Sequence, residues 1–441
     1  MNMKKALSIL LLLVFTLPAM AQGNRLQKID SLMNYYYEHN KFMGSLSIRE
    51  RGVLVYDKSY GFADVQTQQA ATKDTKYKIG GITQMFTATL VFQLIEEKKL
   101  TLKTKLSDFY PKIKNADKIT IANLLNHTSG IFDINADPAF AQWVTKFQAR
   151  KSMLDRIIAY EPAFAPNAKV EYSNTNYLLL GYIIQDVTKK TFKENIAQRI
   201  AKKAILKNTY YYGKTNPKRN EAYSYTFDNG KWIKQEEWNE AGVGAAGGLF
   251  STTADLTKFA QALFDGKLVN AESVAEMNKI DMGYGKGVMN FMFAERKFAG
   301  HNGNIEGFTS VLGYYPKEQI GFSLVLNGAN CDFNELVLGI LSCYYKLPYR
   351  FPDFVNKVSV DENTLKKYEG NYTNPTLPFV IEVMLHEGRL RVHADEQGTF
   401  YITPISQTEF KHEGSGVVME FTSTGFILKQ NGTSTNFTKK Q

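Results

Sequence analysis

Strand-like segments lie at both ends of the main part of this chain, and helices and loops occupy the stretch between them. Alternation of polar and apolar residues, with a Gly-containing turn at 50–52, indicates a hairpin near the start. The predicted strands are 44–49, 53–60, 287–292, 297–301, 308–315 and 321–327. Helices are expected over 26–38 before them and over 333–345 after them. This order predicts one antiparallel sheet completed by both ends of a single α/β (α+β) domain, with a mainly helical insert.

A second strand-rich region follows a proline-containing segment, Leu-Pro-Tyr-Arg-Phe-Pro at 347–352. We assign a domain to 22–346, a linker to 347–358 and a small domain to 359–441. Strands are expected in the small domain at 379–385, 389–393, 399–405, 417–422 and 425–429. Short strands with frequent turn residues predict an all-β module, either a barrel or a curled sheet.

The first 21 residues have the layout of a secretory signal peptide. Lys4 and Lys5 precede an apolar run at 6–17, and Ala19-Met20-Ala21 gives a small-x-small cleavage site before Gln22. The apolar run is too short for a membrane span, which needs about 20 residues. We therefore expect an exported protein, periplasmic or secreted, with no membrane span.

Composition excludes several classes of function. Hydrophobic residues make up 44% of the chain and charged residues 22%, as in a globular protein rather than a disordered one. The formal net charge is +10, but the lysines are scattered and form no basic run. Nucleic-acid binding is not expected, whereas mild attraction to anionic envelope polymers is consistent with the charge.

The cysteines and histidines predict neither a disulfide nor a metal site. The predicted helix over 333–345 would put Cys343 about 15 Å along the axis from the helix start, just after Cys331, whereas the Cα atoms of a disulfide lie within about 7 Å of each other. We expect two buried thiols. His386 and His393 share a predicted hairpin without acidic or Cys partners, so no metal or other cofactor is expected.

One segment bears most directly on function. Residues 77–88 read Tyr-Lys-Ile-Gly-Gly-Ile-Thr-Gln-Met-Phe-Thr-Ala and open a predicted helix over 83–97, whose apolar spacing should bury one face. The segment resembles the active-site segment of the penicillin-recognising serine hydrolases, which include class C β-lactamases, D-alanyl-D-alanine peptidases and related esterases. That family carries Ser-x-x-Lys at the helix start. Gly81 and Gln84 stand at those two positions here.

The resemblance continues through four further segments in the same order. They are Leu-Leu-Asn-His-Thr-Ser-Gly at 124–130, Tyr-Ser-Asn at 172–174, Ala-Gly-Gly-Leu-Phe-Ser-Thr at 246–252 followed by Asp255, and Gly-His-Asn-Gly at 300–303. One departure is Asn167, where the family usually has Gly after a Pro. The resemblance covers about residues 25–345 and implies a β-lactamase/transpeptidase-like sheet flanked by helices. The 359–441 module resembles a small β-domain appended to some relatives.

By the same resemblance, Tyr172 is the base, Asn174 a polar positioning group, and His301 lines the opposite side of the site. The ligand-binding positions are Gly81, Gln84, Gly303 and Asn304, with the amides of Gly81 and Asn304 as oxyanion donors. Gly81 has no side-chain oxygen, so no acyl-enzyme can form there. Gln84 is neutral, so Tyr172 lacks a cation that would lower its pKa from about 10.

Other residues do not supply an obvious nucleophile. Thr83 should face away from the site, Ser173 should point into the protein, and Ser129 and Ser251 suit local turns and caps. His127 suits a buried structural role. For Tyr172 and His301, the alternative is that they are packed, hydrogen-bonded core residues with no catalytic role.

Three hypotheses follow. The chain is a pseudoenzyme that binds a peptide or a carboxylate-bearing, cell-wall-derived ligand in the former active-site cleft. Alternatively, it is a working hydrolase of esters, amides or D-amino-acid peptides that uses water or an unrecognised nucleophile. In the third hypothesis it is a structural or partner-binding envelope protein.

Overall fold

The computed structural model describes residues 25–228, 230–280, 284–354, 358–377, 379–386, 388–394, 398–412, 417–430 and 432–440. The proposed signal peptide lies outside these residues and stays a prediction. The described chain divides into two compact units, one of Phe42–Ala329 and one that combines the described residues up to Lys41 with those from Asn330 onward. No helix of the described residues is long and apolar enough to cross a membrane.

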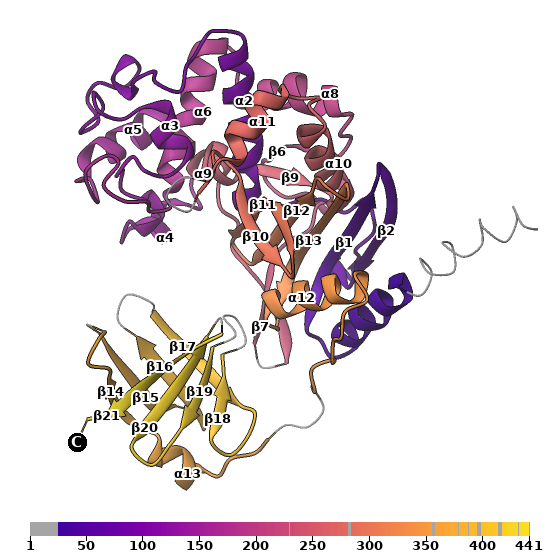
Figure 1. The fold of residues 1–441 in the computed structure, drawn as a ribbon, viewed down its shortest axis with the longest axis vertical. Coiled ribbons are helices and arrows are strands. Elements are labelled where there is room, and N and C mark those ends of the chain that lie inside the picture. Colours follow the sequence, from indigo (N-terminus) through magenta and orange to yellow (C-terminus); the bar gives the residue numbers. More distant parts are fainter. Residues whose placement is uncertain are drawn as a thin grey trace, which may run out of the picture. The chain divides into compact units, whose positions relative to one another are not determined.

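The unit Phe42–Ala329 is built on an antiparallel sheet whose order is β10-β11-β12-β13-β1-β2 (Figure 1). Its strands are β1 (Phe42–Glu50), β2 (Val53–Tyr60), β10 (Met289–Phe293), β11 (Arg296–Ile305), β12 (Phe308–Tyr315) and β13 (Ile320–Ala329). β1 pairs with β13 from Phe42 opposite Ala329 to Glu50 opposite Ile320. The prediction that distant parts of the chain complete one sheet is therefore confirmed.

Two short strands that the sequence pattern did not indicate extend this sheet. β7 (Tyr225–Asp228) pairs in parallel with the end of β13, and β8 (Lys231–Lys234) pairs with β7. Smaller sheets join β3 (Phe62–Asp64) to β4 (Gln69–Ala70), and β5 (Tyr77–Lys78) to β9 (Leu249–Ser251) and β6 (Tyr210–Tyr211).

Helices fill the region between β2 and β10. They are α2 (Thr83–Glu96), α3 (Ile121–Leu125), α4 (Phe140–Trp143), α5 (Arg150–Ala159), α6 (Asn174–Thr188), α7 (Phe192–Asn195), α8 (Lys202–Ala204), α9 (Glu240–Gly247), α10 (Thr253–Phe264) and α11 (Ala271–Asn278). A π-helical turn, η4 (Ile196–Ala201), joins α7 to α8, and the 3-10 turns are η1 (Gly80–Ile82), η2 (Leu106–Asp108), η3 (Ile134–Ala136) and η5 (Pro217–Arg219).

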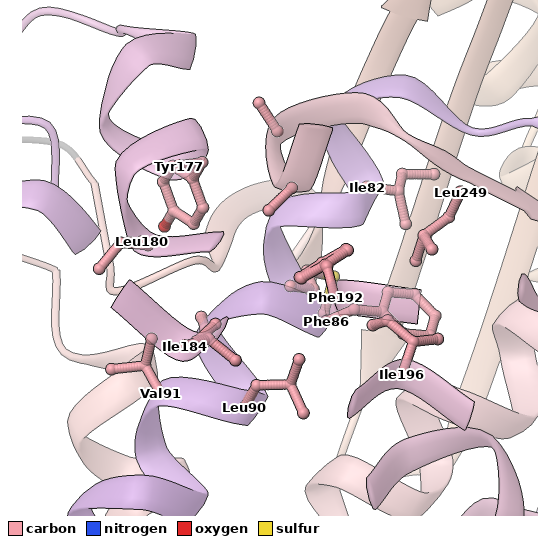
Figure 2. Close-up of a cluster of buried hydrophobic side chains, with 14 of the residues drawn as sticks. Ile82, Phe86, Leu90, Val91, Tyr177, Leu180, Ile184, Phe192, Ile196 and Leu249 are labelled. Carbon is pink, nitrogen blue, oxygen red and sulfur yellow. The ribbon is translucent and has the colours of Figure 1, made fainter. Parts of the chain in front are cut away.

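Helix α2 is buried on all sides over most of its length. Every residue from Thr83 to Leu94 is buried, including the polar Gln84 and Gln93. The expectation that only one face would be buried is wrong, because α6, α9 and η4 all pack around α2. Figure 2 shows where α2 meets α6, with Phe86, Leu90 and Val91 on one helix and Tyr177, Leu180 and Ile184 on the other.

The second unit holds the helix over 25–38, α12 (Phe333–Tyr344), α13 (Glu362–Lys367) and a closed eight-stranded barrel. The barrel strands are β14 (Gly370–Thr373), β15 (Val380–His386), β16 (Arg389–Ala394), β17 (Gly398–Pro404), β18 (Glu409–Lys411), β19 (Val418–Phe421), β20 (Gly425–Gln430) and β21 (Thr433–Lys439). Inward-facing aromatic residues such as Phe410 and Phe426 fill it. The all-β prediction is confirmed, and Cys331 and Cys343 are both buried thiols, as expected.

Candidate active-site cleft

Backbone contact between η1 and β11 forms the base of the candidate site. A Cβ placed on Gly303 would lie 2.2 Å from the Ile79 carbonyl oxygen and 2.7 Å from the Gly81 nitrogen, so only Gly allows this approach. The Ser310 hydroxyl donates to the Ile79 carbonyl over 2.9 Å and fixes the same contact from β12. Gly80, at φ +51°, turns the chain into α2 immediately beside Asn304. The start of α2 and the end of β11 are thereby held together.

A cleft of about 710 Å³, including its open mouth, lies over this contact. It is lined by Gly81, Asn135, Tyr172, Asn174, Tyr284, Met289, Asn302, Gly303 and Asn304. The structure thus brings five of the residues expected from sequence into one cleft. Gln84 and His301 lie behind this lining, where their exposed fractions are 0% and 3%. Asn135, Tyr284 and Met289 were not predicted, since they come from the 3-10 turn η3, a loop and a strand end that carry no recognisable motif.

A chain of hydrogen bonds links four polar side chains in and behind the cleft lining. Gln84 Nε2 donates to Tyr172 Oη over 2.5 Å, and Tyr172 Oη donates to Asn174 Oδ1 over 3.1 Å. Asn174 Nδ2 in turn donates to Asp133 Oδ2 over 3.1 Å. The chain therefore joins α2 to the first residue of α6 and then to η3. Each polar side chain in it is held in one orientation by its neighbours.

Asp133 is a site-forming residue that sequence reasoning missed. Its Oδ1 accepts from the backbone amide of Asn174 (3.1 Å) and from that of Asn135 (3.2 Å), so it caps both α6 and η3. Burial raises the pKa of its carboxyl, while these hydrogen bonds oppose the rise. An Asp that precedes a short helical turn is a common cap, and this was the only signal in the sequence.

Tyr172 is held as a neutral phenol. Burial raises its pKa well above the ordinary value of about 10, and the nearby Asp133 charge raises it further. The hydrogen bond from Gln84 works in the opposite direction but does not reverse the shift. At neutral pH the hydroxyl keeps its proton, so it is a hydrogen-bonding group and a poor base.

Two buried histidines lie behind the cleft and are also neutral. Burial lowers the pKa of His301 to about 4, and burial together with the His301 charge lowers that of His127 to about 3. His127 Nδ1 accepts from the Ser173 amide over 3.1 Å, and its ring centroid lies 4.7 Å from that of Tyr172. His127 therefore has the structural surroundings expected of it. His301 Nδ1 lies 2.6 Å from the carbonyl oxygen of Asn302, its neighbour in the chain.

The Ser and Thr hydroxyl groups that were weighed as alternative nucleophiles do not line the cleft. Thr83 and Ser173 are 0% and 3% exposed, and neither hydroxyl hydrogen-bonds within the described residues. Ser129 Oγ donates to Asn176 Oδ1 over 2.6 Å, and Ser251 Oγ lies 2.8 Å from Thr209 Oγ1. In the described part of the chain, the cleft lining offers amides and phenols, but no carboxylate, ammonium or aliphatic hydroxyl.

The fold and this site define a β-lactamase/transpeptidase-like protein with an added C-terminal β-barrel. The chain belongs to the Beta-lactamase family, whose family model matches residues 30–337. This places it among serine-hydrolase-family proteins.

Individual relatives agree with this assignment. Penicillin-binding protein 4* of Bacillus subtilis (strain 168) is 24% identical over 444 residues, covering 93% of this chain and 97% of the relative. The crystal structure of D-amino acid amidase from Ochrobactrum anthropi SV3 complexed with L-phenylalanine amide has a TM-score of 0.65 at 25% identity, covering 73% of this chain and 99% of that one. The octameric penicillin-binding protein homologue from Pyrococcus abyssi has a TM-score of 0.67 at 23% identity and covers 93% and 99%, which shows the shared fold.

Proposed function

We propose that this protein is an exported, acylation-incompetent member of the family that binds a peptide or carboxylate-bearing envelope ligand in the cleft. In this proposal Gly81 and Gln84 replace the nucleophilic Ser and its partner Lys. Export rests on the signal-peptide pattern of residues 1–21.

The observation that carries the proposal is the closed space at Gly81. A Cβ built there would lie 2.7 Å from the Asn302 carbonyl oxygen, 3.2 Å from His301 Cε1 and 3.3 Å from Tyr172 Oη. The first of these contacts is with backbone, so β11 would have to move to admit any side chain. Even the Cβ of a nucleophilic side chain therefore does not fit unless this backbone shifts.

Gln84 and Tyr172, at the positions that would transfer protons, are also unsuited to acylation. An amide at Gln84 bonds the Tyr172 hydroxyl, and burial keeps that hydroxyl protonated. An activated nucleophile needs an adjacent base or a lowered pKa, and this pair supplies neither. A site with these groups favours binding through neutral hydrogen bonds over covalent catalysis.

The cleft offers exposed hydrogen-bonding groups to a ligand. β10 pairs with β11 from Met289 opposite Gly300 to Phe293 opposite Arg296, and the following part of β11 lines the cleft, with Asn302 and Asn304 exposed. An extended ligand can lie along this part of the strand and exchange hydrogen bonds with its backbone and side-chain amides. The names of the relatives, penicillin-binding proteins and a D-amino acid amidase, support a peptide or amide as the ligand class.

Intact-mass spectrometry combined with a binding measurement tests the proposal. The purified mature chain is incubated with benzylpenicillin and with a fluorophosphonate, and N-acetyl-D-alanyl-D-alanine is titrated into a second sample by calorimetry. We expect no mass increase with either probe and saturable binding of the peptide. A covalent adduct, or turnover of an ester or lactam, would establish the hydrolase alternative. Absence of peptide binding, with no adduct, would overturn the ligand-binding role and favour the structural alternative.

A further inference from the structure

A second cavity, of about 680 Å³ including its open mouth, shares no lining residue with the cleft. Residues from the loop before α5, the start of α5, α6, the start of α7, β6 and α9 line it. Ala241, Gly244 and Ala245 of α9 face this cavity, whereas Val243 and Ala246 of the same helix line a pocket of about 350 Å³ beside Gly81.

The lining is aromatic. Tyr182, Phe192 and Tyr211 contribute their rings, and Phe192 and Tyr211 meet edge to face with centroids 5.6 Å apart. Phe147 also lines the cavity although 74% of its surface is exposed. An aromatic ring left in water beside a cavity bordered by other rings is well placed to cover an apolar ligand.

The charged residues of the lining are both cations. They are Arg150 and Lys193, and none of the described residues that line the cavity is acidic. The Arg150 guanidinium lies 4.8 Å from the Tyr182 ring centroid. Its Nη2 atom donates to Asp186 Oδ2 over 2.5 Å and also to Tyr110 Oη.

These two bonds orient the Arg150 guanidinium and leave other donors for a ligand. Within the described residues, Nε and Nη1 of Arg150 make no hydrogen bond, and no carboxylate lies within ion-pair distance of Lys193. Two cations beside aromatic rings, one of them ion-paired with the partly exposed Asp186, make the cavity complementary to a negative charge.

We propose that this cavity binds a small hydrophobic carboxylate. The apolar body lies among Tyr182, Phe192 and Tyr211, and the carboxylate is held by Arg150 and Lys193. The site is separate from the Gly81 cleft and does not depend on the function proposed for that cleft.

Calorimetric titration of the mature chain with 2-naphthoate tests this site. We expect saturable 1:1 binding that weakens about tenfold or more in Arg150→Met and in Lys193→Met, because each loses a charge-assisted contact. The matched control is Lys151→Met, which removes a cation from the neighbouring position on α5, where Lys151 is 86% exposed and pairs with Asp155. The neutral analogue 2-naphthamide should bind much more weakly than the carboxylate.

Lys193→Met keeps the test decisive if Arg150→Met folds poorly after losing its bonds to Asp186 and Tyr110. Unchanged naphthoate affinity in Lys193→Met and in folded Arg150→Met would place any binding elsewhere and overturn the assignment. Equal binding of 2-naphthamide, or the absence of saturable naphthoate binding, would overturn it as well.

Discussion

Lys78 Nζ lies 2.6 Å from Glu306 Oε1, and the two side chains are 0% and 2% exposed. Lys78 ends β5, three residues before Gly81, and Glu306 occupies the turn after β11, two residues beyond Asn304. Glu306 Oε1 also accepts from the Trp238 amide over 2.7 Å. This buried ion pair therefore joins the two backbone segments that form the base of the cleft.

Breaking this pair should destabilise the protein strongly. Lys78→Met leaves Glu306 buried without its cation, and the expected loss is roughly 3–5 kcal/mol of unfolding free energy. Urea denaturation measures it, and the double variant Lys78→Met/Glu306→Gln should lose less than the sum of the single variants. Removal of the exposed pair Lys151–Asp155 is the control and should cost about 0.3–0.5 kcal/mol. A loss in Lys78→Met no larger than in that control would contradict a structural role for the buried pair.

Adding a Cβ at Gly81 should destabilise the protein, whatever its effect on activity. Gly81→Ala and Gly81→Ser should each cost about 1–3 kcal/mol, because the Asn302 carbonyl must move. Thermal unfolding compares them with Gly213→Ala, since a Cβ at Gly213 meets no atom within 4 Å.

Equal stability of Gly81→Ser and the parent chain would show that the space is open. In that case the double variant Gly81→Ser/Gln84→Lys becomes a fair test of restored esterase activity. With the space closed, we expect the double variant to remain inactive.

The sheet could be predicted from the sequence because its strands are long and alternate clearly. Strands of two to four residues, such as β7 and β18, carry too few alternations to be distinguished from loops. β21 was missed for another reason, since Thr433–Lys439 is largely polar and contributes mainly Phe437 to the barrel core. The burial of α2 on all sides depends on three partners that come from distant parts of the chain.

The site could be predicted in part. Motifs in a fixed order indicated Tyr172, Asn174 and Gly303, because each has a sequence signature. Asp133 and Glu306 belong to no such motif, since their roles come from loop conformations that bring a carboxylate to a helix start or to a buried cation. The closed space at Gly81 likewise depends on the distance between β11 and Gly81 in the folded chain. The identities of the residues do not give that distance.

The hydroxyl of Tyr172 should matter for stability more than that of a neighbouring tyrosine. Tyr172→Phe removes a bond to Gln84 and another to Asn174 in a partly buried chain, and the expected cost is about 1–3 kcal/mol. Tyr284→Phe is the control, because its hydroxyl hydrogen-bonds to no described residue and it lines the same cleft. Urea unfolding of both variants provides the comparison, and equal costs would argue against a structural role for the hydrogen-bond chain.

The two buried histidines should make the protein sensitive to acid below about pH 6.5. Their folded pKa values, about 4 for His301 and about 3 for His127, are lower than the unfolded value near 6.5. The unfolded chain therefore binds more protons between these limits, and stability falls as the pH falls through that window. Each histidine should contribute a loss of about 1.6 kcal/mol between pH 6.5 and pH 5. Urea midpoints across this range measure the slope, and His301→Gln and His127→Gln should each flatten it. An unchanged slope in both variants would mean that the imidazoles charge as readily in the folded chain as in the unfolded one.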